Sequence, residues 1–271
     1  MKDVSEFQNI GSIHNLTKKM IRKKALALRN QGLLYDVQNE EMEDYFRGSV
    51  DRFCDIAWEI RHAKRVLDVG CGQGVLLLML RELGHECYGL DMAESSNVLC
   101  ERFKQKNIKF QVCNIEVDSL PYPDGFFDAA VCCQVLEHFT HSHLWAIQEL
   151  HRVFRNGGII EIDVPNVADF RNRSRILRGK NITFDYEKHY LLEKPILYKG
   201  LSFYPNRHNR EFTKNELKLL LGAGSFADKR VSYLKSRRYR EGLERIRGIG
   251  SAIRDIIPSF RKSLIAFAVK A

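Results

Sequence analysis

The chain has 271 residues, of which 44% are hydrophobic and 28% are charged, and its formal net charge is +9. This composition is typical of a globular protein and excludes a disordered or fibrous chain. The length suits about two domains, or one α/β domain with insertions. The positive charge favours an anionic partner such as nucleic acid, an anionic lipid surface or a phosphorylated substrate, without choosing among them.

Two features bear on location. No stretch approaches the roughly 18 consecutive apolar residues of a membrane-spanning helix, and residues 1–24 lack the apolar segment of a signal peptide. We therefore expect a cytoplasmic protein with reduced cysteines. The cysteines contain no Cys-x-x-Cys pair and mostly fall in apolar runs, so we expect core residues rather than disulfides or zinc ligands: Cys54, Cys71, Cys87, Cys100, Cys113, Cys132 and Cys133.

The first part of the chain has helical patterns. Residues 13–29 and 40–61 are polar and basic, with apolar side chains at roughly helical spacing. From residue 65 onward, short apolar runs alternate with amphipathic segments, which is typical of βαβ units and predicts a doubly wound α/β fold with a parallel sheet. We predict strands at residues 66–69, 86–90, 109–113, 127–133 and 158–164, and helices at residues 74–83, 94–106 and 143–154.

The alternation breaks after Pro165 for about 45 residues, which is long for a loop. It resumes with a helix at residues 213–221, where Thr213 caps the helix and Glu216 completes a capping box. Strands at 226–234 and 264–269 then enclose a basic stretch. We therefore expect an N-terminal helical segment, residues 1–64, and an α/β domain, residues 65–271, with insertions at about 165–212 and 235–262.

A glycine-rich turn joins the first strand of this domain to its first helix. It has the sequence Gly70-Cys71-Gly72-Gln73-Gly74 and follows the carboxyl end of a parallel strand, where ligands bind. Glycines permit positive φ angles and let a ligand approach the backbone closely. Val75 or Leu77 occupies the third glycine position of the dinucleotide pattern Gly-x-Gly-x-x-Gly, so NAD is disfavoured.

Two acids accompany this turn. Asp68, two residues before Gly70, can hold the cationic amino group of an amino acid, which a pyrophosphate ligand lacks. Asp91 closes the second strand at about the spacing of an acid that accepts hydrogen bonds from ribose hydroxyls. A nucleoside joined to an amino acid describes S-adenosylmethionine (SAM). The alternative is that the glycines only form a tight turn and the acids only cap helices.

These residues resemble the class I SAM-dependent methyltransferases. Residues 68–74 are similar to the first motif of the family, 120–128 to its loop before the fourth strand, 134–138 to its post-strand motif, and 152–158 to its helix end before the fifth strand. The resemblance implies a seven-stranded, mostly parallel sheet, in which the sixth strand is parallel to the first five and the seventh antiparallel. It implies SAM as the cofactor, bound by Asp68, Gly70, Cys71, Gly72, Gly74, Asp91, Met92, Asn114, Ile115, Gln134, Leu136 and Glu137. At position 114 the family often has an aspartate that contacts the adenine amino group.

Residues 164–166 and 208–226 are further similar to small-molecule methyltransferases of polysaccharide and natural-product pathways. If the acceptor is a hydroxyl, a general base assists the transfer, and histidine is the usual type. Our first candidate is His138, followed by His141, His208 and His189, and for each the alternative is a cap or a bond to backbone. Tyr45 and Arg47 are candidates to close over the methionine carboxylate, against the alternative of a packing aromatic and a solvated arginine. No metal is expected, because His189 and His208 with Asp185 or Glu187 match no compact metal motif.

Both insertions leave the carboxyl ends of strands in the implied sheet, so with the N-terminal helices we expect them to form a lid over the acceptor pocket. The second insertion has apolar residues at helical spacing among arginines, at Leu243, Ile246, Ile249, Ile253, Ile256 and Ile257. This amphipathic basic helix either packs on the domain, or contacts a membrane surface or an anionic, lipid-linked acceptor.

These patterns together predict methyl transfer from SAM to a small molecule, at an oxygen of a sugar, a glycolipid precursor or a similar metabolite. One alternative is an RNA methyltransferase, since Tyr239 lies among Arg237, Arg238 and Arg240. Nucleic acid is nevertheless disfavoured, because no RNA-binding module is recognisable. The other alternative is a protein that binds SAM without turnover.

Overall fold

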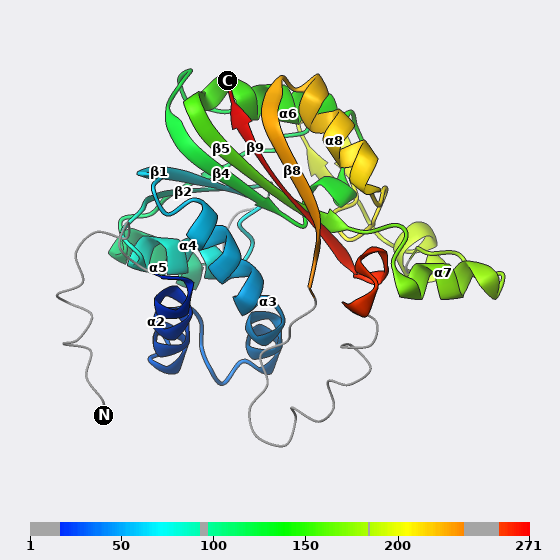
Figure 1. Ribbon diagram of the computed structural model, residues 1–271, viewed down its shortest axis with the longest axis horizontal. Helices are drawn as coiled ribbons and strands as arrows, with labels where there is room; N and C mark the ends of the chain where they lie inside the picture. Colours follow the sequence, from blue (N-terminus) through cyan, green and yellow to red (C-terminus); the bar gives the residue numbers. More distant parts are fainter. Residues whose placement is uncertain (1–16, 93–96, 184, 236–254) are drawn as a thin grey trace. The chain divides into compact units, whose positions relative to one another are not determined.

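The structure is a computed structural model that describes residues 17–92, 97–183, 185–235 and 255–271 (Figure 1). Seven strands of this part of the chain form one sheet, which confirms the α/β fold. Their order is β3 (Lys109–Val112), β2 (Glu86–Asp91), β1 (Arg65–Val69), β4 (Phe127–Cys133), β5 (Phe154–Pro165), β9 (Ser263–Lys270) and β8 (Phe226–Leu234). The chain divides into two compact units, one up to residue 112 and one from residue 113 onward, and each is described by itself.

The first unit contains the parallel strands β1, β2 and β3, with Val66 opposite Cys87 and Tyr88 opposite Lys109. β1 is buried along almost its whole length, as expected of a parallel strand covered on both faces. Helix α4 (Val75–Glu82) follows β1, and helix α5 (Asn97–Gln105) follows β2. The predicted strands and helices of this unit are therefore confirmed to within a few residues.

Two N-terminal helices belong to the same unit. Helix α2 (Lys18–Asn30) begins after Thr17, whose hydroxyl accepts a hydrogen bond from the Met20 amide, and helix α3 is Glu40–Glu59. The two helices pack together and are joined by ion pairs such as Arg22 with Asp51 at 2.8 Å. Both predicted helices are present, although residues 13–16 lie outside the described part of the chain.

The second unit contains the other four strands. β4 and β5 are parallel, and β9 is antiparallel to both β5 and β8, so β8 runs parallel to β5. This is the strand direction that the family resemblance implies for the sixth and seventh strands. Helix α8 is Lys214–Ala223, and the predicted capping box between Thr213 and Glu216 is present.

The predicted start of the fifth strand, at residue 158, is wrong. Helix α6 (His143–Val153) ends without a glycine cap, and β5 begins immediately at Phe154. Phe154 is fully buried and pairs with Phe127, so tertiary packing extends the strand through the Asn156-Gly157-Gly158 segment that suggested a loop. At Gly158 a Cβ atom would lie 2.9 Å from the Arg155 carbonyl oxygen, so the glycine permits this close backbone path.

The segment from 165 to 212 has more regular structure than the sequence predicted. It contains helix α7 (Phe170–Leu177), the π-helical turn η3 (Glu187–Leu191) and a hairpin of β6 (Ile196–Tyr198) and β7 (Leu201–Phe203). These elements are too short to give a clear periodic pattern.

Most of the predicted amphipathic basic helix, including Leu243, Ile246, Ile249 and Ile253, lies outside the described residues, as do Arg237, Arg238, Tyr239 and Arg240. Ile256 and Ile257 are described and exposed, just before the short 3₁₀ turn η5 (Pro258–Phe260). Within the described part of the chain, no helix combines the length and apolar character needed to cross a membrane.

Candidate functional site

The glycine turn of the first unit is held against the end of β2. The amides of Gly70 and Cys71 both donate to the Leu90 carbonyl, at 2.9 and 3.0 Å, and the Gly74 amide donates to the Cys71 carbonyl at 2.8 Å. Gly70, Gly72 and Gly74 all have positive φ angles, of 67°, 49° and 67°. This backbone path favours glycine at each of the three positions.

Two of these glycines differ in what surrounds them. A Cβ atom on Gly74 would lie 2.5 Å from the Phe103 ring, so this glycine is required by packing inside the unit. A Cβ atom on Gly72 would meet nothing within 4 Å, and Gly72 itself is exposed. The open space over Gly72 fits a ligand that approaches the backbone, as the predicted cofactor does.

Asp91 ends β2 beside this turn. One of its carboxylate oxygens, Oδ2, accepts a hydrogen bond from the Gly72 amide at 2.9 Å. Asp91 therefore stabilises the backbone at the exposed Gly72. Asp68 is almost fully buried at the end of β1, while Met92 is half-buried after Asp91.

Cys71 occupies the centre of the turn and is buried. Burial, and next the charges of Asp68 and Asp91, raise the pKa of the thiol, so it stays protonated and acts as a small apolar side chain. Its sulfur would lie 3.1 Å from a Cβ atom on Gly89. The turn and β2 are therefore closely packed.

The other residues that were expected near the methionine carboxylate have partners within α3. Arg47 Nε donates to Glu43 Oε1 at 2.6 Å, one helical turn away. Tyr45 is exposed and its ring lies 6.0 Å from that of Phe53. The structure explains both side chains by helix contacts, and their role at the cofactor stays a prediction.

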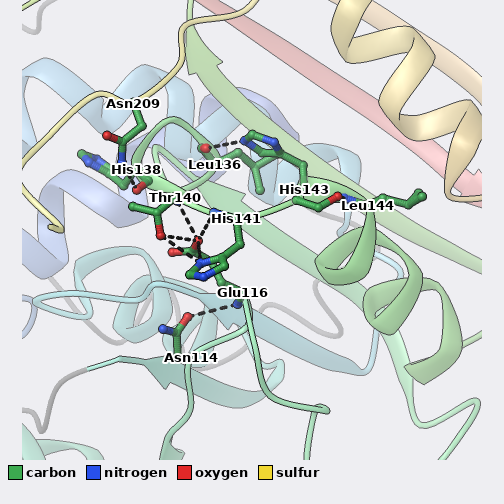
Figure 2. A network of polar contacts seen from close by, with 10 residues as sticks. Asn114, Glu116, Leu136, His138, Thr140, His141, His143, Leu144 and Asn209 are labelled. Carbon is green, nitrogen blue, oxygen red and sulfur yellow. Dashed lines mark hydrogen bonds and ion pairs between the residues drawn. The ribbon is translucent and has the colours of Figure 1, made fainter. Parts of the chain in front are cut away.

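In the second unit, Asn114 and Ile115 follow β3 and are buried. The Asn114 side-chain oxygen accepts a hydrogen bond from the Glu116 amide at 3.0 Å, which forms an Asx turn (Figure 2). The Asn114 amide donates to Asp118 at 3.1 Å. These bonds fix the loop after β3 and give Asn114 a local function in addition to the predicted contact with adenine.

Glu116 is a site residue that the sequence analysis did not identify. Its Oε2 atom accepts hydrogen bonds from the Thr140 amide at 2.7 Å and the His141 amide at 2.8 Å (Figure 2). The Thr140 hydroxyl and His141 Nδ1 each lie 3.2 Å from the same atom. One buried carboxylate thus anchors the loop that follows β4. A lone acid in a loop has no periodic signal by which the sequence could have revealed it.

The loop after β4 carries the predicted motif. Gln134 has a positive φ angle of 56°, and its side-chain amide donates to Asp163 Oδ1 at 2.6 Å. The turn η2 (Leu136–His138) follows, in which Leu136 and Glu137 are buried. His143 Nε2 donates to the Leu136 carbonyl at 2.9 Å, a contact that the sequence analysis also missed.

His138 lies against the segment 207–210 and is hydrogen-bonded to it (Figure 2). Its Nδ1 donates to the Arg207 carbonyl at 2.8 Å, and its own carbonyl accepts from the Asn209 side chain at 2.8 Å. A carbonyl can only accept, so Nδ1 carries the proton and Nε2 presents its lone pair. Burial, assisted by the neighbouring His208, lowers the pKa of His138 below 6.5 and favours the neutral base.

The other candidate histidines are placed differently. The His208 ring lies 5.0 Å from the His138 ring, so the structure groups these two candidates. His141 is tied to Glu116 and its ring lies 5.4 Å from that of Phe203. The His189 carbonyl accepts from Arg207, which gives this residue a structural contact. The roles of all four in catalysis stay predictions.

Among the residues that the structure describes, two groups of side chains could supply metal ligands. Donor atoms of Glu137, His138 and His208 lie within 4.8 Å of one another, and so do those of Cys133, Glu161 and Asp163. Ligand atoms of a four-coordinate zinc ion lie about 3.3 Å apart, because Zn–N and Zn–O bonds are about 2.0–2.1 Å. His138 Nε2 is 3.9 Å from Glu137 Oε1, so the first group would have to contract to hold zinc.

The loop before β4 contains most of the segment 120–128, which resembles a motif of the family. Hydrogen bonds with Arg152 and Glu149 join this loop to α6. Arg152 donates to the carbonyls of Leu120 and Tyr122, both at 2.9 Å, and to Asp124 at 2.8 Å. Glu149 accepts from the Leu120 amide at 2.7 Å. Arg152, the first residue of the family-like segment 152–158, therefore holds the chain that leads into β4.

Comparison with known proteins shows that part of this chain is similar to methyltransferases. Residues 67–162 match the family model described as a methyltransferase domain. The chain is 32% identical over 108 residues to the mitochondrial ubiquinone biosynthesis O-methyltransferase of Mus musculus, covering 38% of this chain and 29% of that protein. It is 35% identical over 119 residues to the demethylmenaquinone methyltransferase of Thermus thermophilus, covering 42% of this chain and 53% of that protein. The matched region is thus about half the length of these relatives or less.

Solved structures show the same fold. The PH0226 protein of Pyrococcus horikoshii has a TM-score of 0.55 at 16% identity, covering 90% of this chain and 97% of that one. The 1,6-didemethyltoxoflavin-N1-methyltransferase of Burkholderia thailandensis, solved with S-adenosylhomocysteine, has a TM-score of 0.52 at 17% identity, covering 97% and 92%. Residues 67–162 are therefore similar to methyltransferase domains, and the chain shares the fold of these solved structures.

Proposed function

We propose that this protein transfers the methyl group of SAM to a small-molecule acceptor in the cytoplasm, and that the acceptor atom is an oxygen. The observation that carries the proposal is the glycine turn. Gly72, in the middle of the turn, is exposed and has open space above it, and its amide is bound by Asp91. Gly74, by contrast, packs against the Phe103 ring. The open space over Gly72 leaves room for the cofactor to approach the backbone.

Asp91, Asp68 and the glycine turn are proposed to hold the ribose and amino-acid parts of the cofactor. Asn114, Ile115, Gln134, Leu136 and Glu137 are the further residues proposed to contact it. The cofactor supplies a methyl group on a positively charged sulfur. Transfer breaks the sulfur–carbon bond and forms a carbon–oxygen bond in line, so alignment of the acceptor supplies much of the rate.

His138 is proposed to take the proton of the acceptor hydroxyl at Nε2. Two observations support this role: the bond to the Arg207 carbonyl places the proton on Nδ1, and burial lowers the pKa so that the ring is neutral at pH 7. His208, beside it, is the second candidate. His141 is proposed as a positioning residue, because it is tied to Glu116.

The acceptor is proposed to be a sugar, a glycolipid precursor or a similar metabolite, with anionic or lipid-linked forms favoured by the charge of +9. The two curated relatives are named for ubiquinone and menaquinone synthesis, so quinone precursors join this set. Incubation with radiolabelled SAM and fractionated cell extract tests the acceptor class. Label in RNA, and in no small molecule, would contradict it.

Cofactor binding is tested separately by calorimetry with SAM. We expect binding by the wild-type protein and a loss of about tenfold or more in Asp91→Ala, since a hydrogen bond to a charged group contributes roughly 1.5–3 kcal/mol. Asp91→Asn is the matched control, because its amide oxygen can still accept from Gly72. No binding by the wild-type protein would remove the proposed function. Binding without methyl transfer to any fraction would instead favour a non-catalytic SAM-binding protein.

A further inference from the structure

Helix α7, in the second unit, exposes large apolar side chains. Ile176 and Leu177 near its C-terminal end have 60% and 87% of their surface accessible to solvent. Side chains exposed to this extent add little to the hydrophobic stabilisation of the fold, which grows with the area removed from water. Exposed apolar residues that occur together mark interaction surfaces more often than single ones do.

The same helix is strongly basic. Residues 170–181 contain no acidic residue and five cations, which are Arg171, Arg173, Arg175, Arg178 and Lys180. Within the described part of the chain, none of the five has a carboxylate within ion-pair distance. Arg173, Arg175 and Arg178 donate to backbone carbonyls instead, at 2.6, 2.6 and 2.9 Å. Apart from the electrostatic interaction of Arg171 with Asp169, the residue before the helix, the charge of these five cations is not offset by an ion pair within the described residues.

A second apolar segment lies beside α7. The turn η5 lies next to α7 (Figure 1). The rings of Phe170 and Phe260 are 5.6 Å apart, and the Arg173 guanidinium lies 5.4 Å from the centre of the Phe260 ring. Ile256 and Ile257, immediately before η5, are 73% and 46% exposed. Two segments about 80 residues apart in sequence are thus in contact through Phe170, Arg173 and Phe260, and each carries exposed aliphatic side chains.

We propose that α7 and residues 255–260 dock on the surface of an anionic phospholipid bilayer. Arginine and lysine are attracted to anionic headgroups, while isoleucine and leucine enter the boundary between headgroups and acyl chains. A bilayer uses both properties of this surface. A second copy of the chain would bring the same positive charge and repel it, and RNA would use the cations but leave the aliphatic side chains in water.

This inference does not rest on the proposed methyl transfer, so its test needs no turnover. The full-length protein is sedimented with vesicles of phosphatidylcholine alone, and with vesicles that also contain phosphatidylglycerol. We expect binding to the anionic vesicles alone, weakening as salt is raised. Leu177→Asn should weaken binding about tenfold, as expected for withdrawing a leucine from an apolar environment. The double variant Arg171→Gln, Lys180→Gln should weaken it roughly 30-fold, from about fivefold for each cation.

Helix α8 offers matched controls in the same unit. Leu219 is 72% exposed and Lys218 is also exposed, so Leu219→Asn makes the same change as Leu177→Asn, and Lys218→Gln removes one cation, on another surface. We expect both to bind vesicles as the wild type does, with unchanged circular dichroism in all variants. The proposal is overturned if anionic vesicles are not bound or if the α8 variants lose as much as the α7 variants. Self-association of the wild type that Leu177→Asn abolishes would also overturn it.

Discussion

Gly72 and Gly74 occupy similar left-handed conformations for different physical reasons, and alanine at each position separates them. Alanine in this region costs about 1–2 kcal/mol, partly offset by about 0.4–1 kcal/mol from a less flexible unfolded chain. Gly72→Ala should therefore lose only about 1 kcal/mol of unfolding free energy. In Gly74→Ala the new Cβ atom would lie 2.5 and 2.6 Å from two atoms of the Phe103 ring. Phe103 is fully buried, so overpacking of about 1–3 kcal/mol adds to the backbone cost.

Urea unfolding measures the stability of both variants, and calorimetry measures their affinity for SAM. We expect Gly74→Ala to be destabilised by about 2–4 kcal/mol. Gly72→Ala should stay folded yet bind SAM at least tenfold more weakly, because its methyl group fills the space through which the cofactor approaches the backbone. Wild-type affinity in Gly72→Ala would refute the placement of the cofactor over this residue. Equal stability of the two variants would refute the packing argument for Gly74.

Four further outcomes are expected. Glu116→Ala removes an acceptor from the Thr140 and His141 amides, so the unfolding free energy should fall by about 3 kcal/mol and kcat should fall with it. Thr140→Val removes the hydroxyl's 3.2 Å bond to Glu116 and its 2.9 Å bond with His141 Nδ1 but keeps both amide bonds, so it should lose only about 1 kcal/mol. Equal losses would contradict the anchoring role. His138→Asn should lower kcat about 100-fold and abolish the acidic limb of the pH–rate profile. In the wild type this limb should lie below pH 6.5, because burial lowers the pKa of His138. An unchanged profile in the variant would argue against His138 as the general base. Dialysis against EDTA should leave methyl transfer unchanged, and activity restored only by zinc or magnesium would show that the prediction of no metal is wrong. Burial opposes ionisation of Glu43, but hydrogen bonds from Arg29, Arg47 and Tyr35 hold its pKa at about 2. The stabilisation of the fold by the ionised Glu43 is therefore complete above pH 4.5 and is lost as the pH falls toward 2. Glu43→Gln should flatten the acid limb of the curve of unfolding free energy against pH, and a curve identical to that of the wild type would exclude a contribution of Glu43 to acid unfolding.

Local patterns in the sequence predicted most of the fold. The strand at 127–133 was found with correct bounds, because both faces of a buried strand are apolar and the run is bounded by turn residues. The capping box between Thr213 and Glu216 was found because it needs only two side chains at fixed spacing. The start of β5 was missed because Asn156-Gly157-Gly158 has the composition of a loop, whereas burial of Phe154 determines the strand.

The candidate site was predicted in part for the same reason. The glycine turn and Asp91 were singled out from their positions after two consecutive strands, but the bond from the Gly72 amide to Asp91 was not predicted, and the contact of Asp91 with the ribose stays a prediction. The pairing of His138 with His208 could not be derived from spacing, because 70 residues separate them and the contact depends on the path of the insertion. Glu116 was missed because its main partners are the backbone amides of Thr140 and His141, about 25 residues away, and bonds to backbone amides leave no pattern in the sequence.

The bonds around His138 indicate how the insertion after β5 is linked to the candidate base. The amides of Asn209 and Arg210 both donate to the Glu137 carbonyl, at 2.8 and 3.2 Å, and the Arg207 carbonyl accepts from His138. The end of the insertion therefore fixes both the backbone of η2 and the tautomer of the histidine that it carries. A change in the insertion that moved residues 207–210 would break the bond from His138 Nδ1 to the Arg207 carbonyl. The tautomer of His138 would then change together with the surface that contacts the acceptor. For this reason a transplanted insertion should change turnover as well as acceptor choice, unless residues 207–210 are kept with it.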